Sequence, residues 1–220
     1  MVSGRDPAQP VGVLARLASA LGRGDEKPNQ ELAAALAASG NGDDIAVLAH
    51  ALATAAKPVR HDAIKVLYEI GALRPDLIAP HAQALLTALK SRDNRIVWGA
   101  LTALDTLAAT APELIAAHLP DILDAADQGS VIAKDKAVSM LATLAANGNS
   151  FAWDRLLAIL RTSADNQTPM YAEQALRAAP MQNVEALAEV VGARAGSIPQ
   201  SAKRTRLEKV LRRLATLKAK

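Results

Sequence analysis

The sequence predicts an all-α protein, and three observations lead to that prediction. Half of its 220 residues are hydrophobic, yet only 2% are aromatic. Alanine and small aliphatic side chains must therefore fill the interior, which suits closely packed helices better than sheets. Apolar residues recur at helical spacing, and no segment alternates apolar and polar residues as a half-buried strand would. The third observation is an internal repeat, which predicts how the helices are organised.

Two stretches of the chain match at an offset of 37 residues, 71–81 (GALRPDLIAPH) and 108–118 (AATAPELIAAH). The offset continues upstream, where it relates three sets of apolar residues at the helical spacing i, i+1, i+4, i+7. The sets are Ala63, Ile64, Leu67 and Ile70; Ala100, Leu101, Leu104 and Leu107; and Ala137, Val138, Leu141 and Leu144. Downstream, the pair Leu85 and Leu86 maps onto Ile122 and Leu123 and then onto Ile159 and Leu160. Each repeat is therefore predicted to be two antiparallel helices.

The limits of the hairpins follow from breakers and from the fading of the repeat. Pro75 and Pro112 mark the end of a first helix and the start of a second one. A shorter hairpin is predicted at the N-terminal end, and a degenerate one, 169–179 with 184–195, at the other. Weakening toward the ends is expected, because a terminal repeat covers the core on one side only.

This pattern resembles the HEAT family and its armadillo-like relatives over roughly residues 29–195. Two segments carry the resemblance, the pair Val59-Arg60 and the run 91–97 (SRDNRIV), each followed by the apolar stripe of a first helix. The resemblance implies a right-handed α-α superhelix, an α-solenoid, of about five HEAT-like hairpins. In the family, an aspartate and an arginine often form a ladder between repeats. Here the arginine position holds Arg60, Val97 and Lys134, and the aspartate position holds Thr54, Ser91 and Gln128.

The chain ends in a strongly basic segment. We therefore predict three parts, a flexible N-terminus (1–10), a HEAT-like repeat domain (11–198) and a basic C-terminal helix (199–220). The body before this helix is net acidic, although the whole chain carries +3. Ser201 is expected to be the N-cap. The apolar stripe of the helix comprises Leu207, Val210, Leu211, Leu214 and Leu217, and its basic face comprises Lys203, Arg204, Arg206, Lys209, Arg212 and Arg213. Two interpretations are open, a capping helix with its bases in water and an element that docks on nucleic acid, an anionic membrane or an acidic partner.

Motifs of catalysis and of cofactor binding are missing from the sequence. It has no phosphate-binding glycine loop, no nucleophile elbow and no zinc-protease motif. It has no cysteine, which excludes thiolate chemistry and disulfides. No apolar run approaches the roughly 18 residues of a membrane span. We therefore expect a non-enzymatic cytoplasmic protein without cofactor or metal.

Charged and polar residues recur at fixed positions of the second helices, which are the concave side in proteins of the resembled family. The predicted partner-binding residues are His81, Thr87, His118, Asp121, Asp124, Arg155 and Arg161. The first function predicted from them is a scaffold that binds an unidentified protein or peptide, and a solvated helix face is the competing interpretation. The alternative function is nucleic-acid binding, as a relative of the HEAT-like alkylpurine DNA glycosylases. The acidic body and the scarcity of aromatic residues disfavour it, so we expect at most weak, non-specific nucleic-acid binding through the basic helix.

The two tryptophans are the only large amphipathic side chains in the sequence. Trp98 is expected near the start of a first helix and Trp153 near the start of a second one. Packing at repeat junctions is the favoured interpretation for both, and an exposed contact for a partner is the alternative.

Overall fold

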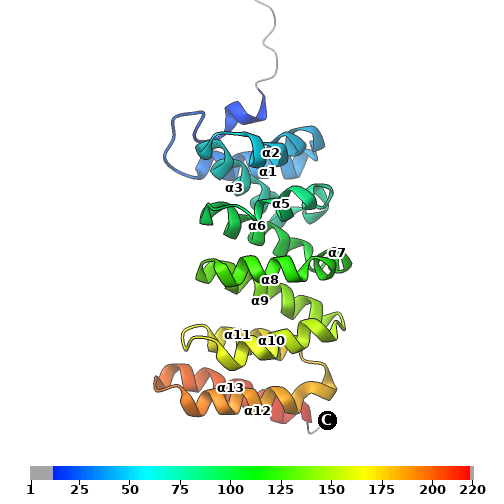
Figure 1. Ribbon diagram of the computed structural model, residues 1–220, viewed down its shortest axis with the longest axis vertical. Helices are drawn as coiled ribbons and strands as arrows, with labels where there is room; N and C mark the ends of the chain where they lie inside the picture. Colours follow the sequence, from blue (N-terminus) through cyan, green and yellow to red (C-terminus); the bar gives the residue numbers. More distant parts are fainter. Residues whose placement is uncertain (1–11, 219–220) are drawn as a thin grey trace, which may run out of the picture. The chain divides into compact units, whose positions relative to one another are not determined.

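A computed structural model describes residues 12–218, which are helical almost throughout and include no strand. The predicted flexible N-terminus, residues 1–10, lies outside the described residues. The chain divides into two compact units, Met1–Thr110 and Ala111–Lys220, each built from helical hairpins (Figure 1). The predicted fold class, an all-α solenoid of helical hairpins with a C-terminal capping helix, is confirmed.

The first unit packs its helices around α3, which contacts α1, α2 and α6. The 3-10 turn η1 precedes these helices. The bounds of its elements are η1 Val13–Arg16, α1 Lys27–Ser39, α2 Gly42–Thr54, α3 Lys57–Leu73, α4 Pro75–Ile78, η2 Ala79–His81, α5 Ala82–Ala88 and α6 Asn94–Leu107.

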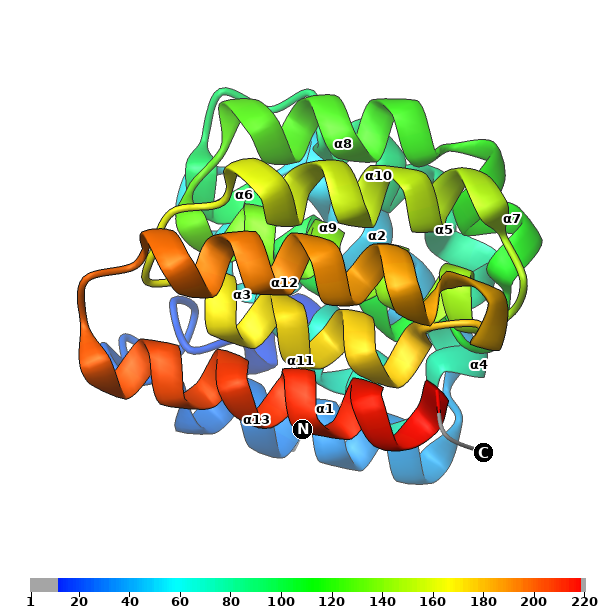
Figure 2. The ribbon, with the colours of Figure 1, turned by 90° about the horizontal axis from the view of Figure 1, so that it is seen from below.

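The second unit has two layers of helices. One layer holds α8, α10 and α12, and the other holds α9, α11 and α13 (Figure 2). The bounds of its elements are α7 Pro112–Ala117, α8 Leu119–Gln128, α9 Val131–Ala146, α10 Ser150–Thr162, α11 Thr168–Ala178, η3 Met181–Asn183, α12 Val184–Ser197 and α13 Ser201–Lys218.

The repeated apolar stripe lies in the core of each unit. Every position of the stripe within 63–70, 100–107 and 137–144 is at most 2% exposed. The repeated pair on the second helices is also buried, except that Ile159 is half-buried. Burial of such aliphatic side chains contributes about 1.5–3 kcal/mol each before the loss of chain entropy is subtracted. The periodicity therefore identified the residues that hold the hairpins together.

The second helices of the two middle repeats are divided, which the repeat pattern did not predict. In one, α4, η2 and α5 follow each other, and in the other α7 is separate from α8. Pro80 lies within η2, and Pro120 lies in the first turn of α8. A proline lacks the amide hydrogen that would bond the carbonyl four residues earlier, and its ring crowds that carbonyl, so a continuous helix is interrupted at each place.

The C-terminal helix α13 packs on α11 and α12. Leu207, Val210 and Leu214 are at most 2% exposed, so the capping role is confirmed. Arg206 adds a two-pronged contact, because its Nε and Nη2 donate to the carboxylate of Glu173 at 2.9 and 2.8 Å. The helix begins at Ser201, so that this residue is the first helical position and not the residue before it. Lys203 donates to Oδ1 of Asn166 and Lys218 to Oε1 of Glu185, which leaves four exposed basic residues without a partner among the described residues, namely Arg204, Lys209, Arg212 and Arg213.

Two glycines on α3 and α6 mark a close approach between these helices. A Cβ atom on Gly99 would lie 2.6 Å from Cγ1 of Ile64, and one on Gly71 would lie 2.5 Å from Cδ1 of Ile78 and Oγ1 of Thr106. Both distances are too short for real contacts. The glycines therefore allow the backbones to approach where any side chain would separate them.

We expect Gly99→Ala to destabilise the protein by about 1–3 kcal/mol, because the new methyl group overpacks the site around the buried Ile64. Gly192→Ala is the matched control, since that glycine is also helical and has no atom near its added Cβ. It should stabilise the protein by about 0.5–1 kcal/mol through helix propensity. Urea unfolding curves measure both changes. Equal effects of the two substitutions would contradict the close approach.

Candidate protein-binding surface

The second unit exposes opposite charges on two neighbouring helices. On α8, burial of Ile122, Leu123 and Ala126 against the core turns the side chains of Asp121 and Asp124 outward. On α10, Leu156, Leu157 and Leu160 are buried, and Arg155 and Arg161 are exposed. The helix is fixed at its start by Asn149, whose Oδ1 accepts from the amide of Ala152 at 2.8 Å. We call the exposed face with these four predicted residues the α8–α10 surface.

None of the four charged side chains forms a hydrogen bond or an ion pair within the described part of the chain. Their charges are therefore not neutralised by the fold. A free charge on the surface keeps its full capacity to pair with a partner, because no intramolecular contact has to be broken first.

A groove of about 290 Å³ lies between the C-terminal halves of α8 and α10. Leu123 and Ile159 contribute apolar surface, and Asp127 and Lys134 contribute one charge of each sign. Tyr171 on α11 also lines the groove, and its hydroxyl donates to Oδ1 of Asp135 at 2.7 Å. Burial, together with this hydrogen bond, raises the pKa of Tyr171, so the groove carries a neutral phenol.

The remaining predicted site residues are less free. His118 is half-buried at the junction of α7 and α8. In the first unit, Thr87 is exposed, but its hydroxyl donates to the carbonyl of Gln83 in its own helix at 2.8 Å. His81, at the end of η2, is partly buried, and this burial lowers its pKa. His81 and Thr87 belong to the first unit and the other five residues to the second.

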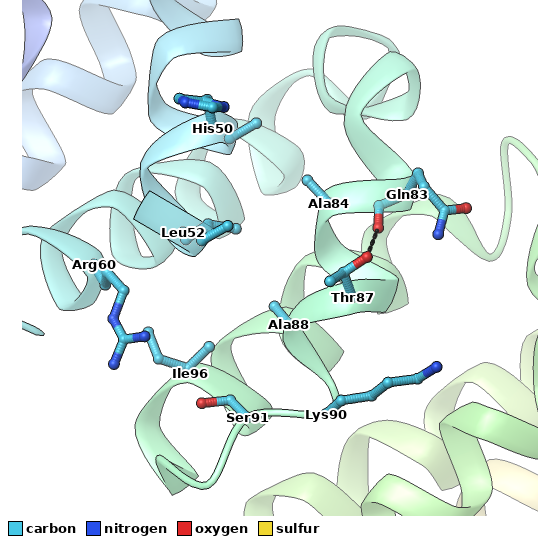
Figure 3. Close-up of a pocket in the computed structure, with 12 residues that line it drawn as sticks. His50, Leu52, Arg60, Gln83, Ala84, Thr87, Ala88, Lys90, Ser91 and Ile96 are labelled. Carbon is cyan, nitrogen blue, oxygen red and sulfur yellow. Dashed lines mark hydrogen bonds between the residues drawn. The ribbon is translucent and has the colours of Figure 1, made fainter. Parts of the chain in front are cut away.

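The first unit has a groove of its own, of about 380 Å³, between α2 and α5 and beside the starts of α3 and α6 (Figure 3). Thr87 lines it, but sequence reasoning did not find His50 or Lys90, and it noticed Arg60 only as part of the repeat. A signal was present in the sequence. The groove coincides with alanine pairs at i and i+4 on both helices, namely Ala49 with Ala53 and Ala84 with Ala88.

Elsewhere in the first unit, one cluster of charges around Lys65 is paired internally. Nζ of the buried Lys65 lies 2.9 Å from Glu26 and 2.7 Å from Glu69. Arg95 on α6 also reaches Glu26, at 3.2 Å. In this cluster each charged group is paired within the protein, in contrast to the four charged residues of the α8–α10 surface.

The tryptophans differ in their surroundings. Trp153 is 3% exposed, which confirms core packing. Trp98 is half-buried, and its ring centre lies 5.8 Å from that of Tyr68 on α3, so it packs between α3 and α6 at the edge of the core. Each tryptophan thus lies within its own unit.

Metal binding and membrane insertion were both searched for along residues 12–218. No group of three or more histidine, aspartate or glutamate side chains there could hold a metal ion. No helix in the same range is long and apolar enough to cross a bilayer.

No model of a protein family matches the sequence, and no curated protein matches it either. Solved structures do match. An engineered protein aligns with 96% of this chain and 98% of its own, at 19% identity and a TM-score of 0.59. A designed armadillo repeat protein aligns with 92% and 98%, at 18% identity and a TM-score of 0.54. The chain has a HEAT- or armadillo-like repeat fold.

A further designed armadillo repeat protein, solved in complex with the peptide (KR)4, covers 92% of this chain and 98% of its own, at 16% identity and a TM-score of 0.55. At such low identities, these similarities to the repeat fold establish the fold alone. None of the reported structures is a DNA glycosylase, so the alternative function gains no support from them.

We expect the pKa of His81 to be below 6.5 in the folded protein, because burial disfavours the imidazolium ion. The unfolded chain then binds more protons than the folded one as the pH falls through about 6.5, so folding stability decreases there. A histidine NMR titration measures the pKa directly. His81→Gln should lose less stability than the unmodified protein between pH 7.5 and 5.5. An upward shift of the pKa would contradict the burial.

Proposed function

We propose that this protein is a non-enzymatic repeat scaffold that binds another protein along its second helices, chiefly through the α8–α10 surface. One observation carries the proposal. Four exposed side chains, two acidic on α8 and two basic on α10, have no partners within the described residues, and the same two helices contribute residues to a groove. Around Lys65 in the first unit, by contrast, acidic and basic side chains pair with one another.

The arrangement of the charges suits a protein partner. The acidic residues lie on α8 and the basic ones on α10, so a matching surface must place positive and negative groups in a defined order. Charge order of this kind contributes more to specificity and association rate than to affinity. The apolar part of the groove, with Leu123 and Ile159, supplies the burial that holds a partner in place.

The open shape of the grooves supports binding over catalysis. Volumes of about 290 and 380 Å³ are at the lower end of the range for small-molecule sites. Stacked helices present extended faces, which suit peptides and domains. The designed repeat protein that carries the peptide (KR)4 is an analogy for this use of the fold.

A second, weaker activity is proposed for the outer face of α13. Arg204, Lys209, Arg212 and Arg213 are exposed there and have no hydrogen-bonded or ion-paired partner among residues 12–218. Binding of nucleic acid by this face would be electrostatic and independent of nucleotide sequence. The reason is that α13 has no aromatic side chain beside its basic residues on which a nucleobase could stack.

For the main proposal, we expect Arg155→Glu/Arg161→Glu to weaken binding of the partner at least tenfold, since two like charges then oppose it. The partner is captured from cell extract with the unmodified protein, identified, purified and titrated by calorimetry. Asp121→Lys/Asp124→Lys should have a similar effect. The matched control, Arg212→Glu/Arg213→Glu on α13, makes the same change in net charge and should alter Kd less than twofold. The proposal fails if the control weakens binding as much as the α8–α10 variants do.

For the α13 face, we expect labelled duplex DNA to bind weakly and to lose affinity steeply with salt. The slope of log K against log salt should be about −0.9 for each phosphate contacted. Fluorescence anisotropy measures the binding, and Arg212→Glu/Arg213→Glu should abolish it. Tight binding that survives this double substitution at physiological salt would contradict the assignment to α13.

A further inference from the structure

The groove of the first unit is cationic. Its lining includes His50, Arg60 and Lys90 and no carboxylate. Its floor is apolar and lined by short side chains, because both α2 and α5 present alanines to it. A site of this composition offers positive charge at the rim and room above a smooth apolar surface.

Arg60 is the unusual member of this lining. No hydrogen bond or ion pair joins its guanidinium to the rest of the described chain, and its Nε is buried without a partner. A buried polar nitrogen without an acceptor costs free energy. A carboxylate of a ligand in the groove would give the guanidinium group the partner that the fold does not supply.

The repeat explains why Arg60 is alone. It occupies the arginine position of the repeat, while the positions where an aspartate would stand hold Thr54 and Ser91. Two repeats further on, the same position holds Lys134, which lines the groove of the second unit together with Asp127. The counterpart of Asp127 in the first groove, also two repeats away, is Ala53. The second groove thus contains its own carboxylate and the first does not.

The carboxylate of Asp93, in a cleft that Arg60 also lines, is already engaged. An open cleft next to the groove shares Arg60 with it and is lined by Lys57, Arg92 and Asp93 as well. Oδ2 of Asp93 lies 2.7 Å from Nε2 of His61 and 3.5 Å from Nζ of Lys57, and its Oδ1 accepts from the amide of Arg95. Asp93 therefore does not neutralise Arg60, and the cleft extends the positive surface.

We propose that this groove binds an extended acidic peptide segment of the partner protein, with carboxylates at Arg60 and Lys90 and small apolar side chains over the alanine floor. The inference rests on the proposed function and names the chemistry of the segment. Figure 3 shows Arg60 beside Ile96 and Lys90 reaching away from it. Because the two cations do not converge on one point, the groove fits charges spaced along a chain better than a single anion.

The test uses a fluorescein-labelled peptide of five Glu-Ala repeats, titrated with the full chain and followed by anisotropy. It should bind at least tenfold more tightly than the matching Lys-Ala peptide. Inorganic phosphate, compared with chloride at equal ionic strength, should not displace it. Stronger binding of the Lys-Ala peptide, or displacement by millimolar phosphate, would overturn the assignment to an acidic segment.

Variants locate the peptide. Arg60→Glu/Lys90→Glu should raise its Kd at least tenfold, which corresponds to about 1.4 kcal/mol. Arg212→Glu/Arg213→Glu, with the same change in net charge, should leave Kd within twofold. Ala53→Phe fills the groove from an exposed position without changing charge and should raise Kd at least fivefold. Lys90→Gln and Ala53→Phe decide the question if substitution of Arg60 prevents folding. Equal losses in the α13 control, or no loss in Ala53→Phe, would overturn the site.

The outcome separates this inference from the function on which it rests. If the Glu-Ala peptide fails to bind while the α8–α10 variants still weaken the partner, the acidic-segment inference is wrong and the scaffold function stands. If the peptide binds at Arg60 while the α8–α10 variants leave the partner unaffected, the groove stands and the main surface of the proposed function is wrong.

Discussion

The structure depends on the burial of one apolar stripe in each first helix. The stripe begins with an alanine in each of the three clear repeats, Ala63, Ala100 and Ala137, and all three are at most 2% exposed. Small side chains at this position, together with glycines such as Gly99, bring neighbouring helices close, so that a core nearly free of aromatics still packs densely. The second helices contribute only part of their circumference to this core. Their outer faces are therefore free to carry charge.

The charged side chains of the protein are of two kinds. Around Lys65 the acids and bases satisfy one another, and α13 is held at Glu173 by Arg206 in the same way. On α8 and α10, and at Arg60, charge is left without an internal partner. Exposed ion pairs contribute little to stability, roughly 0–1 kcal/mol, so stability does not explain the difference. The unpaired groups are the ones that the proposed contacts with a partner would use.

Sequence reasoning predicted the hairpins, the buried stripe and the capping helix, because each leaves a periodic signal along the chain. It missed the division of the second helices, although Pro80 and Pro120 were visible, because the match between repeats outweighed the effect of a single proline. The sequence alone could not predict the cluster of Glu26 with Lys65 or the groove at Arg60. Both join residues that are far apart in sequence, and a groove exists only where two helices face each other. The four charged residues of the α8–α10 surface are exposed, as both interpretations of the sequence required, but their lack of partners could be seen only from side-chain positions.

The alanines of the first groove also bear on how its binding preference can change. Ala53 is exposed and Ala84 half-buried, whereas Leu48 and Leu52 on the same α2 are buried in the core. Replacement of either alanine alters the depth of the groove and leaves the core packing untouched. Substitution of Lys90, which is also exposed, alters the charge of the rim independently. Ligand preference can therefore diverge among descendants of this sequence in single steps, while the residues that keep it folded remain the same.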